Sequence, residues 1–190
     1  DRGFDPEKIG ALGFSAGSHM TVMLGSSSLT QAYQPIDELD KLSCHINLAI
    51  PVYTAYALTD GLTGRNARDG DGIDVKLSDV FKFDANTCPM ALFHGGTDVY
   101  SPNGSIQIYR ELRKMKIPAE IHLFADRGHG FMGNPNKGES GTAFDHWIDR
   151  ITEFMRQMNF DGQLGKEVDL LSRFKSDAYR KEYRKESIWP

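Results

Sequence analysis

Gly13-Phe14-Ser15-Ala16-Gly17 fits the pattern G-x-S-x-G and stands between an apolar run and a helical one, the setting of a nucleophile elbow. Residues 9–14 (IGALGF) predict a short strand, and a helix is expected to follow Ser15 as far as about residue 24. A turn this tight strains the serine backbone and leaves its hydroxyl clear of the sheet. We expect side chains in place of either glycine to collide with the neighbouring strand or helix. The backbone N–H of Ala16, at the helix N-terminus, is the expected donor to an oxyanion.

Strands and helices alternate along the rest of the chain, which predicts a mainly parallel sheet covered by helices. The segment 54–86 is rich in Gly, Asp and Asn and predicts a long insertion or lid. Further strands are expected at residues 46–53 (INLAIPVY, ending at its proline), 89–94 (PMALFH) and 119–124 (AEIHLF), and helices at 105–115 and 141–158.

The length of 190 residues favours one domain. We expect this α/β domain to cover residues 1–160 and residues 161–190 to form a helical C-terminal extension or a linker. The last 25 residues, from Lys166, interleave seven Lys or Arg with aromatic side chains, a pattern also found in RNA-binding segments. Five Asp or Glu nearly balance that charge, so the helix or linker is favoured.

The charge and the hydropathy favour neither nucleic acid nor a membrane as a partner. A net charge of −4 gives no electrostatic reason to expect nucleic acid or a membrane surface. No stretch approaches the roughly 18 consecutive apolar residues that a membrane span needs.

Two cysteines, Cys44 and Cys88, are too few for a disulfide framework or an all-cysteine metal site. They are expected to be either two buried free thiols or one disulfide.

A nucleophilic serine needs a general base, and the base needs an orienting carboxylate. Asp98 lies in HGGTDVYSP just after the strand predicted at 89–94, and His129 lies in DRGHGF after the strand at 119–124. Loops at the carboxyl ends of parallel strands meet at one edge of a sheet. The chain order of nucleophile, acid and histidine also fits the template. The sequence therefore predicts Ser15, Asp98 and His129 as the catalytic triad.

Other residues near these positions have alternative roles. Asp126, three residues before His129, is the alternative acid, although it shares a loop with the histidine. His94 ends a predicted strand and is expected to satisfy backbone hydrogen bonds near the site. His19, one turn past Ser15, is expected to line the substrate pocket rather than to act as the base. Phe131 is the second candidate substrate-binding residue.

The segments GFSAGSHM, AIPVYT, LFHGGTDVYSP and HLFADRGHGF resemble the sugar-ester hydrolases of the α/β-hydrolase superfamily. The resemblance covers about residues 5–158 and is strongest to acetyl xylan esterases and feruloyl-esterase-like bacterial enzymes. These share their core with the dienelactone-hydrolase and prolyl-oligopeptidase branches. It implies a three-layer α/β-hydrolase sandwich without a cofactor, in which Ser15 is acylated, His129 relays the proton and Asp98 orients the imidazole.

The sequence departs from this family at two places. Ser18 stands where the family usually has glycine, a change between small residues. The first strands of the family's sheet, and its H-G-G-type loop with a second oxyanion donor, normally precede the elbow. We expect the fold to lack those N-terminal strands, leaving the strand at 9–14 as an exposed edge. The chain is then expected to pair across that edge with the missing N-terminal segment or, as a homo-oligomer, with another copy.

The resemblance implies a serine carboxylic ester hydrolase that deacylates an acetylated or feruloylated plant carbohydrate, or a small ester. Because such esters are met outside the cytoplasm, a periplasmic or secreted location is expected, with a cytoplasmic location as the alternative. One alternative is a peptidase of the prolyl-oligopeptidase type, although no propeller repeats are present. Another is a non-catalytic hydrolase fragment that serves as an interaction module.

Overall fold

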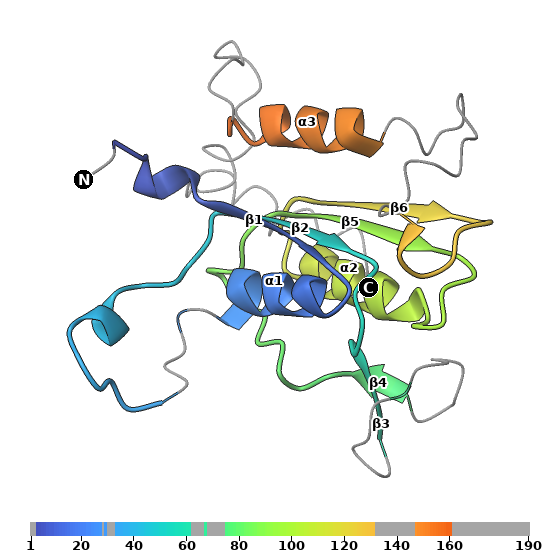
Figure 1. Ribbon diagram of the computed structural model, residues 1–190, viewed down its shortest axis with the longest axis horizontal. Helices are drawn as coiled ribbons and strands as arrows, with labels where there is room; N and C mark the ends of the chain where they lie inside the picture. Colours follow the sequence, from blue (N-terminus) through green and yellow to red (C-terminus); the bar gives the residue numbers. More distant parts are fainter. Residues whose placement is uncertain are drawn as a thin grey trace.

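The computed structural model describes residues 3–27, 29, 33–61, 67, 75–131 and 147–160. Its main sheet has four parallel strands in the order β1-β2-β5-β6 (Figure 1). The strands are β1 (Gly10–Phe14), β2 (Leu48–Val52), β5 (Met90–Gly95) and β6 (Ala119–Phe124). The helices are α1 (Ala16–Ser27), α2 (Asn103–Lys114) and α3 (Trp147–Gln157), with short 3-10 turns at Pro6–Lys8 and Leu39–Lys41.

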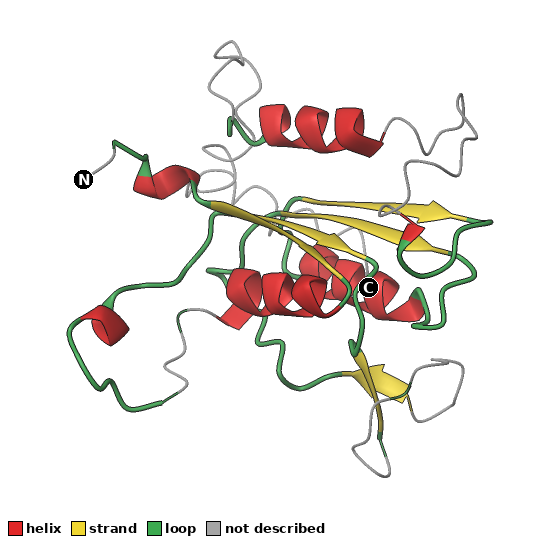
Figure 2. Ribbon diagram, in the orientation of Figure 1, coloured by secondary structure: helices red, strands yellow, loops and turns green. Residues whose placement is uncertain are grey.

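Helices cover both faces of the sheet, as in a three-layer sandwich (Figure 2). On one face, Val22 of α1 and two residues of α2, Ile108 and Leu112, pack with Met90 and Leu92 of the sheet. On the other face, three apolar residues at α3 and its end (Ile151, Phe154, Met158) pack with Leu48, Ile50, Val52 and Phe93. The predicted α/β-hydrolase sandwich is therefore confirmed.

The central strands are buried along their whole length, which explains why they are near-continuous apolar runs. The second strand was expected to end at its proline, but β2 continues through Pro51 to Val52. The N–H groups of Ala49 and Tyr53 both point toward β5 and donate hydrogen bonds there. Because strand residues alternate with period 2, an N–H group at residue 51 would also point toward β5. Proline has no N–H to give, and the Cα pairing of β2 with β5 is interrupted between Ala49 and Val52.

The Gly-, Asp- and Asn-rich segment holds regular structure that composition did not reveal. Two short strands, β3 (Leu58–Asp60) and β4 (Val75–Leu77), pair antiparallel outside the main sheet. Ala57 and Phe81 are buried in the core beneath α1 and α2. The two ends of this segment are therefore anchored in the domain, while its role as a lid stays a prediction.

Helix α1 approaches the sheet closely through small residues. A Cβ atom on Gly13 would lie 2.3 Å from both the Gly17 carbonyl oxygen and the Thr21 hydroxyl. The expected collision is thus confirmed at Gly13. It is wrong at Gly17, where an added Cβ would meet nothing within 4 Å. Gly13 faces the incoming helix, and Gly17 faces outward on the helix itself.

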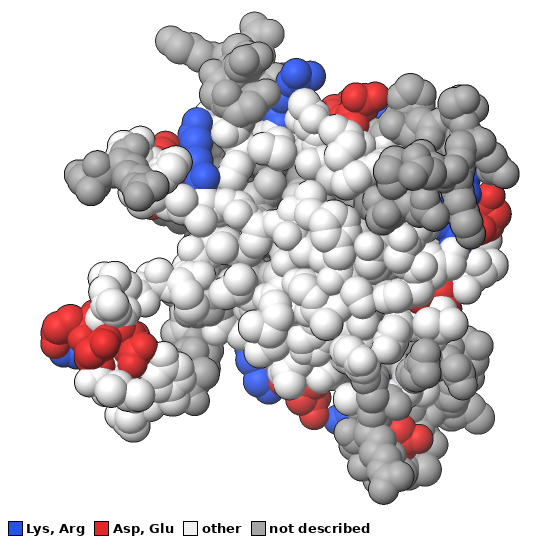
Figure 3. Space-filling model, in the orientation of Figure 1, with Lys and Arg blue, Asp and Glu red and all other residues white. Residues whose placement is uncertain are grey.

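The outer edge of β1 carries apolar side chains. Leu12 is 45% exposed and Phe14 is 41% exposed, although both belong to a strand of the main sheet. Figure 3 shows a broad area without charged side chains on this side of the molecule, with Lys, Arg, Asp and Glu placed around it. Pairing of this edge with another segment or a second copy stays a prediction.

Both cysteines are free, and the expectation of two buried thiols is wrong for Cys44, which is exposed. Cys88 is buried against α1, and burial raises the pKa of its thiol to about 12. Such a thiol is protonated and unreactive at neutral pH. The start of the helix expected at residues 141–158 and the C-terminal segment 161–190 lie outside the described residues. Among the described helices, none is long and apolar enough to cross a membrane.

The two elbow glycines should respond oppositely to alanine. We expect Gly13→Ala to destabilise the fold by about 1–3 kcal/mol or more, because the added methyl group overlaps backbone atoms of α1. Gly17→Ala should leave stability unchanged or raise it by up to about 1 kcal/mol, since alanine favours a helix. Urea unfolding followed by circular dichroism measures both. Equal destabilisation by the two variants would contradict the steric explanation.

Candidate active site

Ser15 lies in the turn between β1 and α1 with a left-handed backbone, at φ 56. Few residues other than glycine adopt this conformation, and it costs on the order of 1–3 kcal/mol. Hydrogen bonds hold the turn: the Ser15 N–H donates to Val52 at 3.1 Å, and the Ser15 carbonyl accepts from His19 at 3.2 Å and from Ala55 at 3.3 Å. The strain expected at this serine is therefore present, and the backbone on both sides maintains it.

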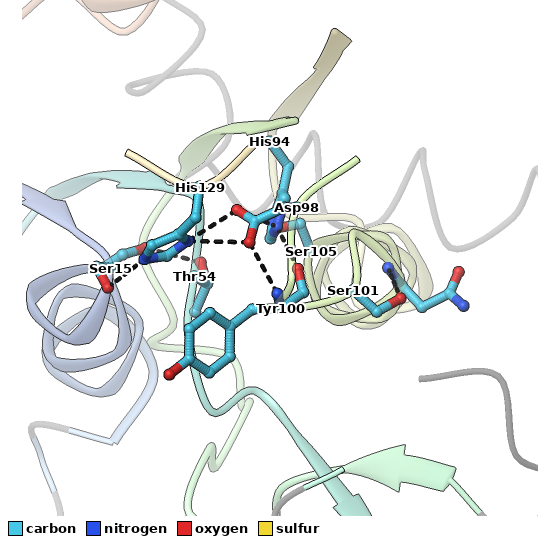
Figure 4. Close-up of polar contacts among 10 residues, drawn as sticks. Ser15, Thr54, His94, Asp98, Tyr100, Ser101, Ser105 and His129 are labelled. Carbon is cyan, nitrogen blue, oxygen red and sulfur yellow. Dashed lines mark hydrogen bonds and ion pairs between the residues drawn. The ribbon is translucent and has the colours of Figure 1, made fainter. Parts of the chain in front are cut away.

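Three polar side chains from separate loops form one hydrogen-bonded chain at the carboxyl edge of the sheet (Figure 4). Ser15 Oγ lies 2.7 Å from His129 Nε2. His129 Nδ1 lies 3.0 Å and 2.9 Å from the two carboxylate oxygens of Asp98. An ionised carboxylate only accepts hydrogen bonds, so Nδ1 carries the ring hydrogen and the Ser15 hydroxyl donates to Nε2. This tautomer leaves Nε2 ready to take the serine proton.

The Asp98 carboxylate remains ionised although its side chain is fully buried. Burial by itself raises the pKa of a carboxyl group. At Asp98 that effect is outweighed by hydrogen bonds from His94, the Tyr100 N–H and His129, so the pKa lies below its usual value. A negative charge is therefore maintained beneath the imidazole.

Gly95 permits the loops of the acid and the histidine to pack together. A Cβ atom at Gly95 would lie 2.1 Å from the Arg127 carbonyl oxygen. The same approach allows the Thr97 N–H to donate to that carbonyl at 3.0 Å and the Gly96 N–H to donate to Phe124 at 2.7 Å. The glycines of HGGTD thus have a steric role in bringing Asp98 to His129.

Aromatic rings that the sequence analysis did not single out surround the imidazole. The rings of Tyr53 and Tyr100 each lie 5.0 Å from that of His129, measured between centroids. Tyr100 also donates its hydroxyl to Tyr56 at 3.0 Å. Tyr53 and Tyr56 both have positive φ, at 40 and 59, which is unusual for aromatic residues. The sequence held one signal for these rings. Tyr53 and Tyr56 follow the carboxyl end of β2, and Tyr100 follows that of β5, where site residues gather.

The alternative acid does not contact the imidazole in the described structure. Asp126 is exposed, and its carboxylate lies 3.6 Å from Arg127 Nε, while His129 Nδ1 faces Asp98. His94 binds a backbone carbonyl as expected, that of Tyr100, at 2.8 Å. It also lies 3.4 Å from the Asp98 carboxylate, a contact the sequence did not suggest.

The remaining candidate residues occupy the surroundings of Ser15. His19 is half-buried, its Nδ1 donates to the Ala55 carbonyl at 3.2 Å, and its ring packs on Phe81. Phe131 packs edge-on against Tyr53, at 5.3 Å between ring centroids. Ala16 is the first residue of α1, so its N–H has no carbonyl partner within the helix. Substrate contact by His19 and Phe131 and oxyanion binding by Ala16 stay predictions. Among the described residues, no group of His, Cys, Asp or Glu could hold a metal ion.

A parallel sheet between two helical layers, with a strained serine at the end of one strand, is the α/β-hydrolase fold. Within that fold, the chain belongs to the prolyl oligopeptidase family, whose sequence model matches residues 2–155. The comparison with curated proteins found no match to the sequence.

Solved structures share this fold. An acetyl ester-xyloside bifunctional hydrolase from Caldicellulosiruptor lactoaceticus matches with a TM-score of 0.61 at 21% identity, over 83% of this chain and 59% of that one. The native esterase 2 of Thermogutta terrifontis matches at 0.59 and 23%, over 87% and 59%. A sugar hydrolase from Lactococcus lactis matches at 0.57 and 20%, over 83% and 61%. The chain therefore spans about three fifths of these relatives' length.

We expect Gly95→Ala to weaken the site without touching any of its polar side chains. The methyl group overlaps the Arg127 carbonyl, so the loops of Asp98 and His129 must separate. The reaction of Ser15 with a fluorophosphonate should slow by at least about tenfold, because displacements near 1 Å have effects of that order or more. Gly130→Ala is unsuitable as a control because φ there is 75. Gly17→Ala, with open space around its Cβ, is the matched control. An unchanged rate in folded Gly95→Ala would contradict this role.

Proposed function

We propose that this protein is a serine carboxylic ester hydrolase that removes an acetyl or feruloyl group from a carbohydrate through an acyl-enzyme. The observation that carries the proposal is the continuous hydrogen-bonded chain from Ser15 through His129 to Asp98. Its spacing fits the nucleophile, base and orienting acid of acyl transfer.

In the first half of the reaction, Ser15 Oγ attacks the ester carbonyl carbon while its proton passes to His129 Nε2. The imidazolium is stabilised by the Asp98 carboxylate at Nδ1. The carbonyl oxygen becomes an oxyanion, and the Ala16 N–H at the N-terminus of α1 donates to it. When the intermediate collapses, the bond to the leaving oxygen breaks and His129 gives that oxygen the proton. The products are a free alcohol and acylated Ser15.

In the second half, a water molecule takes the place of the alcohol. His129 Nε2 removes a proton from the water, and the resulting nucleophile attacks the acyl carbon. Collapse breaks the bond to Ser15 Oγ, which recovers its proton from His129. The carboxylic acid leaves and the enzyme returns to its starting state.

The carbohydrate ester is supported by the surroundings of His129. Tyr100 and Tyr56 place aromatic rings beside the group that protonates the leaving alcohol, and such rings suit a sugar or an aryl group. Fold relatives named as an acetyl ester-xyloside hydrolase and a sugar hydrolase point the same way. The expected location outside the cytoplasm is inferred from this substrate and is part of the same proposal.

The family favours a second candidate, a peptidase, since its model is that of prolyl oligopeptidases. Peptide hydrolysis would use the same three side chains but must protonate a leaving amine. A third reading, a non-catalytic module, would leave Ser15 without reactivity.

The labelling of Ser15 tests the catalytic proposal. We expect a fluorophosphonate to attach to Ser15, located by mass spectrometry, and Ser15→Ala to abolish the labelling. Asp98→Asn should slow it by about 10⁴-fold and His129→Gln by up to about 10⁶-fold, the losses found when triads lose these members. Asp126→Asn is the control, because Asp126 is exposed on the same loop as His129. Wild-type protein that stays unlabelled would refute catalysis by this chain and favour the module.

Substrate classes separate the ester hydrolase from the peptidase. We expect turnover of p-nitrophenyl acetate and of acetylated or feruloylated xylose oligomers, with no turnover of proline-containing dipeptide anilides. Ser15→Ala corrects each assay for background hydrolysis. Faster turnover of the anilides than of any ester would overturn the proposal in favour of the peptidase.

A further inference from the structure

His94, the penultimate residue of β5, is a fully buried histidine that the proposed reaction does not use. Both of its ring nitrogens have polar partners. Nδ1 lies 2.8 Å from the Ser105 hydroxyl, and Nε2 lies 2.8 Å from the Tyr100 carbonyl oxygen and 3.4 Å from the Asp98 carboxylate. Figure 4 shows His94 beside Asp98, with Ser105 nearby.

These partners fix which nitrogen carries the hydrogen. The Tyr100 carbonyl and the Asp98 carboxylate only accept hydrogen bonds, so Nε2 must be the donor. In the neutral ring Nδ1 is then an acceptor, and the Ser105 hydroxyl donates to it. Ser105 lies in the first turn of α2, fully buried. The tautomer of His94 is therefore set by the Tyr100 carbonyl and the Asp98 carboxylate, and the Ser105 hydroxyl of α2 complements it by donating to Nδ1.

The contacts of His94 close a ring around the acid. The Tyr100 N–H donates to Asp98 Oδ1 at 2.8 Å, while His94 Nε2 faces Asp98 Oδ2 and the Tyr100 carbonyl. Oδ1 thus accepts a hydrogen bond from the Tyr100 N–H, and Oδ2 has a polar contact with His94 Nε2 at 3.4 Å. The carboxyl group has little freedom to rotate, and its remaining lone pairs are directed at His129 Nδ1.

Other polar groups around Asp98 do not replace this support. His129 approaches from the loop after β6, and Tyr53 approaches from the loop after β2 with its pKa raised by burial and by the charge of Asp98. His129 changes its protonation during the proposed reaction. The contact from His94 belongs to β5 and is independent of the reacting groups.

We propose that His94 is a positioning residue: braced by Ser105, it holds the Tyr100 carbonyl and the Asp98 carboxylate so that the carboxylate faces His129. The same clamp fixes the Tyr100 ring beside the imidazole. This inference rests on the proposed function, since it assigns a support to the acid of that site.

Two pairs of variants test it. His94→Phe removes the donor, whereas His94→Gln keeps an amide N–H near the position of Nε2. Ser105→Ala removes the brace and leaves the imidazole in place. Ser101→Ala is its matched control, because Ser101 Oγ accepts only the Asn103 N–H among the contacts described at this helix start.

We expect His94→Phe to lower the rate of Ser15 phosphonylation and kcat for p-nitrophenyl acetate by about 10–100-fold, the range found when the residues that orient metal-ligating side chains are replaced. KM should change by a smaller factor than kcat, since Asp98 does not touch the substrate and only the Tyr100 ring loses support near it. His94→Gln should recover a large part of the rate, and Ser105→Ala should lie between wild type and His94→Phe. Ser101→Ala should match wild type.

A proton NMR measurement separates positioning from general destabilisation. The hydrogen bond between His129 Nδ1 and Asp98 should give a far-downfield resonance in wild type that Asp98→Asn abolishes. We expect His94→Phe and Ser105→Ala to shift or weaken it under conditions where urea unfolding shows both variants folded. If His94→Phe does not fold, Ser105→Ala carries the test.

Folded variants with the wild-type resonance and wild-type rate would overturn the inference. Equal rate losses in His94→Phe and His94→Gln, each in proportion to the variant's loss of folding stability, would also overturn it. Wild-type protein that does not react with the fluorophosphonate would refute the proposed function, whereas the resonance would still report whether His94 holds Asp98.

Discussion

The left-handed backbone of Ser15 is the constraint on which the site depends. This conformation is unfavourable for serine, and it persists because β2 accepts its N–H and the loop after β2 donates to its carbonyl. Gly13 has no side chain, so α1 can turn back against the end of β1. The strain is therefore maintained by core packing, and its consequence is a hydroxyl that stands clear of the sheet.

The parallel sheet makes the rest of the site a matter of strand order. Ser15 follows β1, Tyr53 follows β2, Asp98 follows β5 and His129 comes soon after β6. With the strands in the order β1-β2-β5-β6, the histidine must reach back across the sheet edge to the serine. Tyr53 lies beneath that crossing, with its ring against both Phe14 and His129. Each strand thus contributes one side chain to the same edge.

The polar site is continuous with the core on the side of α2. His94 and Ser105 are both fully buried, and their polar atoms are satisfied by one another and by the loop that carries Asp98. A buried polar network of this kind favours a single arrangement, because a different loop conformation would leave its groups without partners. The position of the acid is therefore linked to the packing of a helix that carries no reacting group.

Much of this could be predicted from local patterns. Alternating apolar runs and amphipathic stretches gave the strands and helices of the main sheet, because burial on both faces requires them. The G-x-S-x-G pattern located the elbow, since strong local strain needs particular residues. The glycine-rich loops after β5 and β6 predicted the positions of Asp98 and His129. The β3–β4 pair was missed because strands of three residues leave too short an apolar pattern.

The sequence by itself determined the fold family and the residues able to form the hydrogen-bonded chain, because strand periodicity and tight turns are encoded over a few neighbouring residues. Only the tertiary structure decided that both carboxylate oxygens of Asp98 face His129 Nδ1, that Gly13 but not Gly17 is sterically required, and that His94 and Ser105 contact the acid and its support. Those outcomes depend on contacts between residues far apart along the chain. A local sequence pattern does not determine which of these residues come into contact.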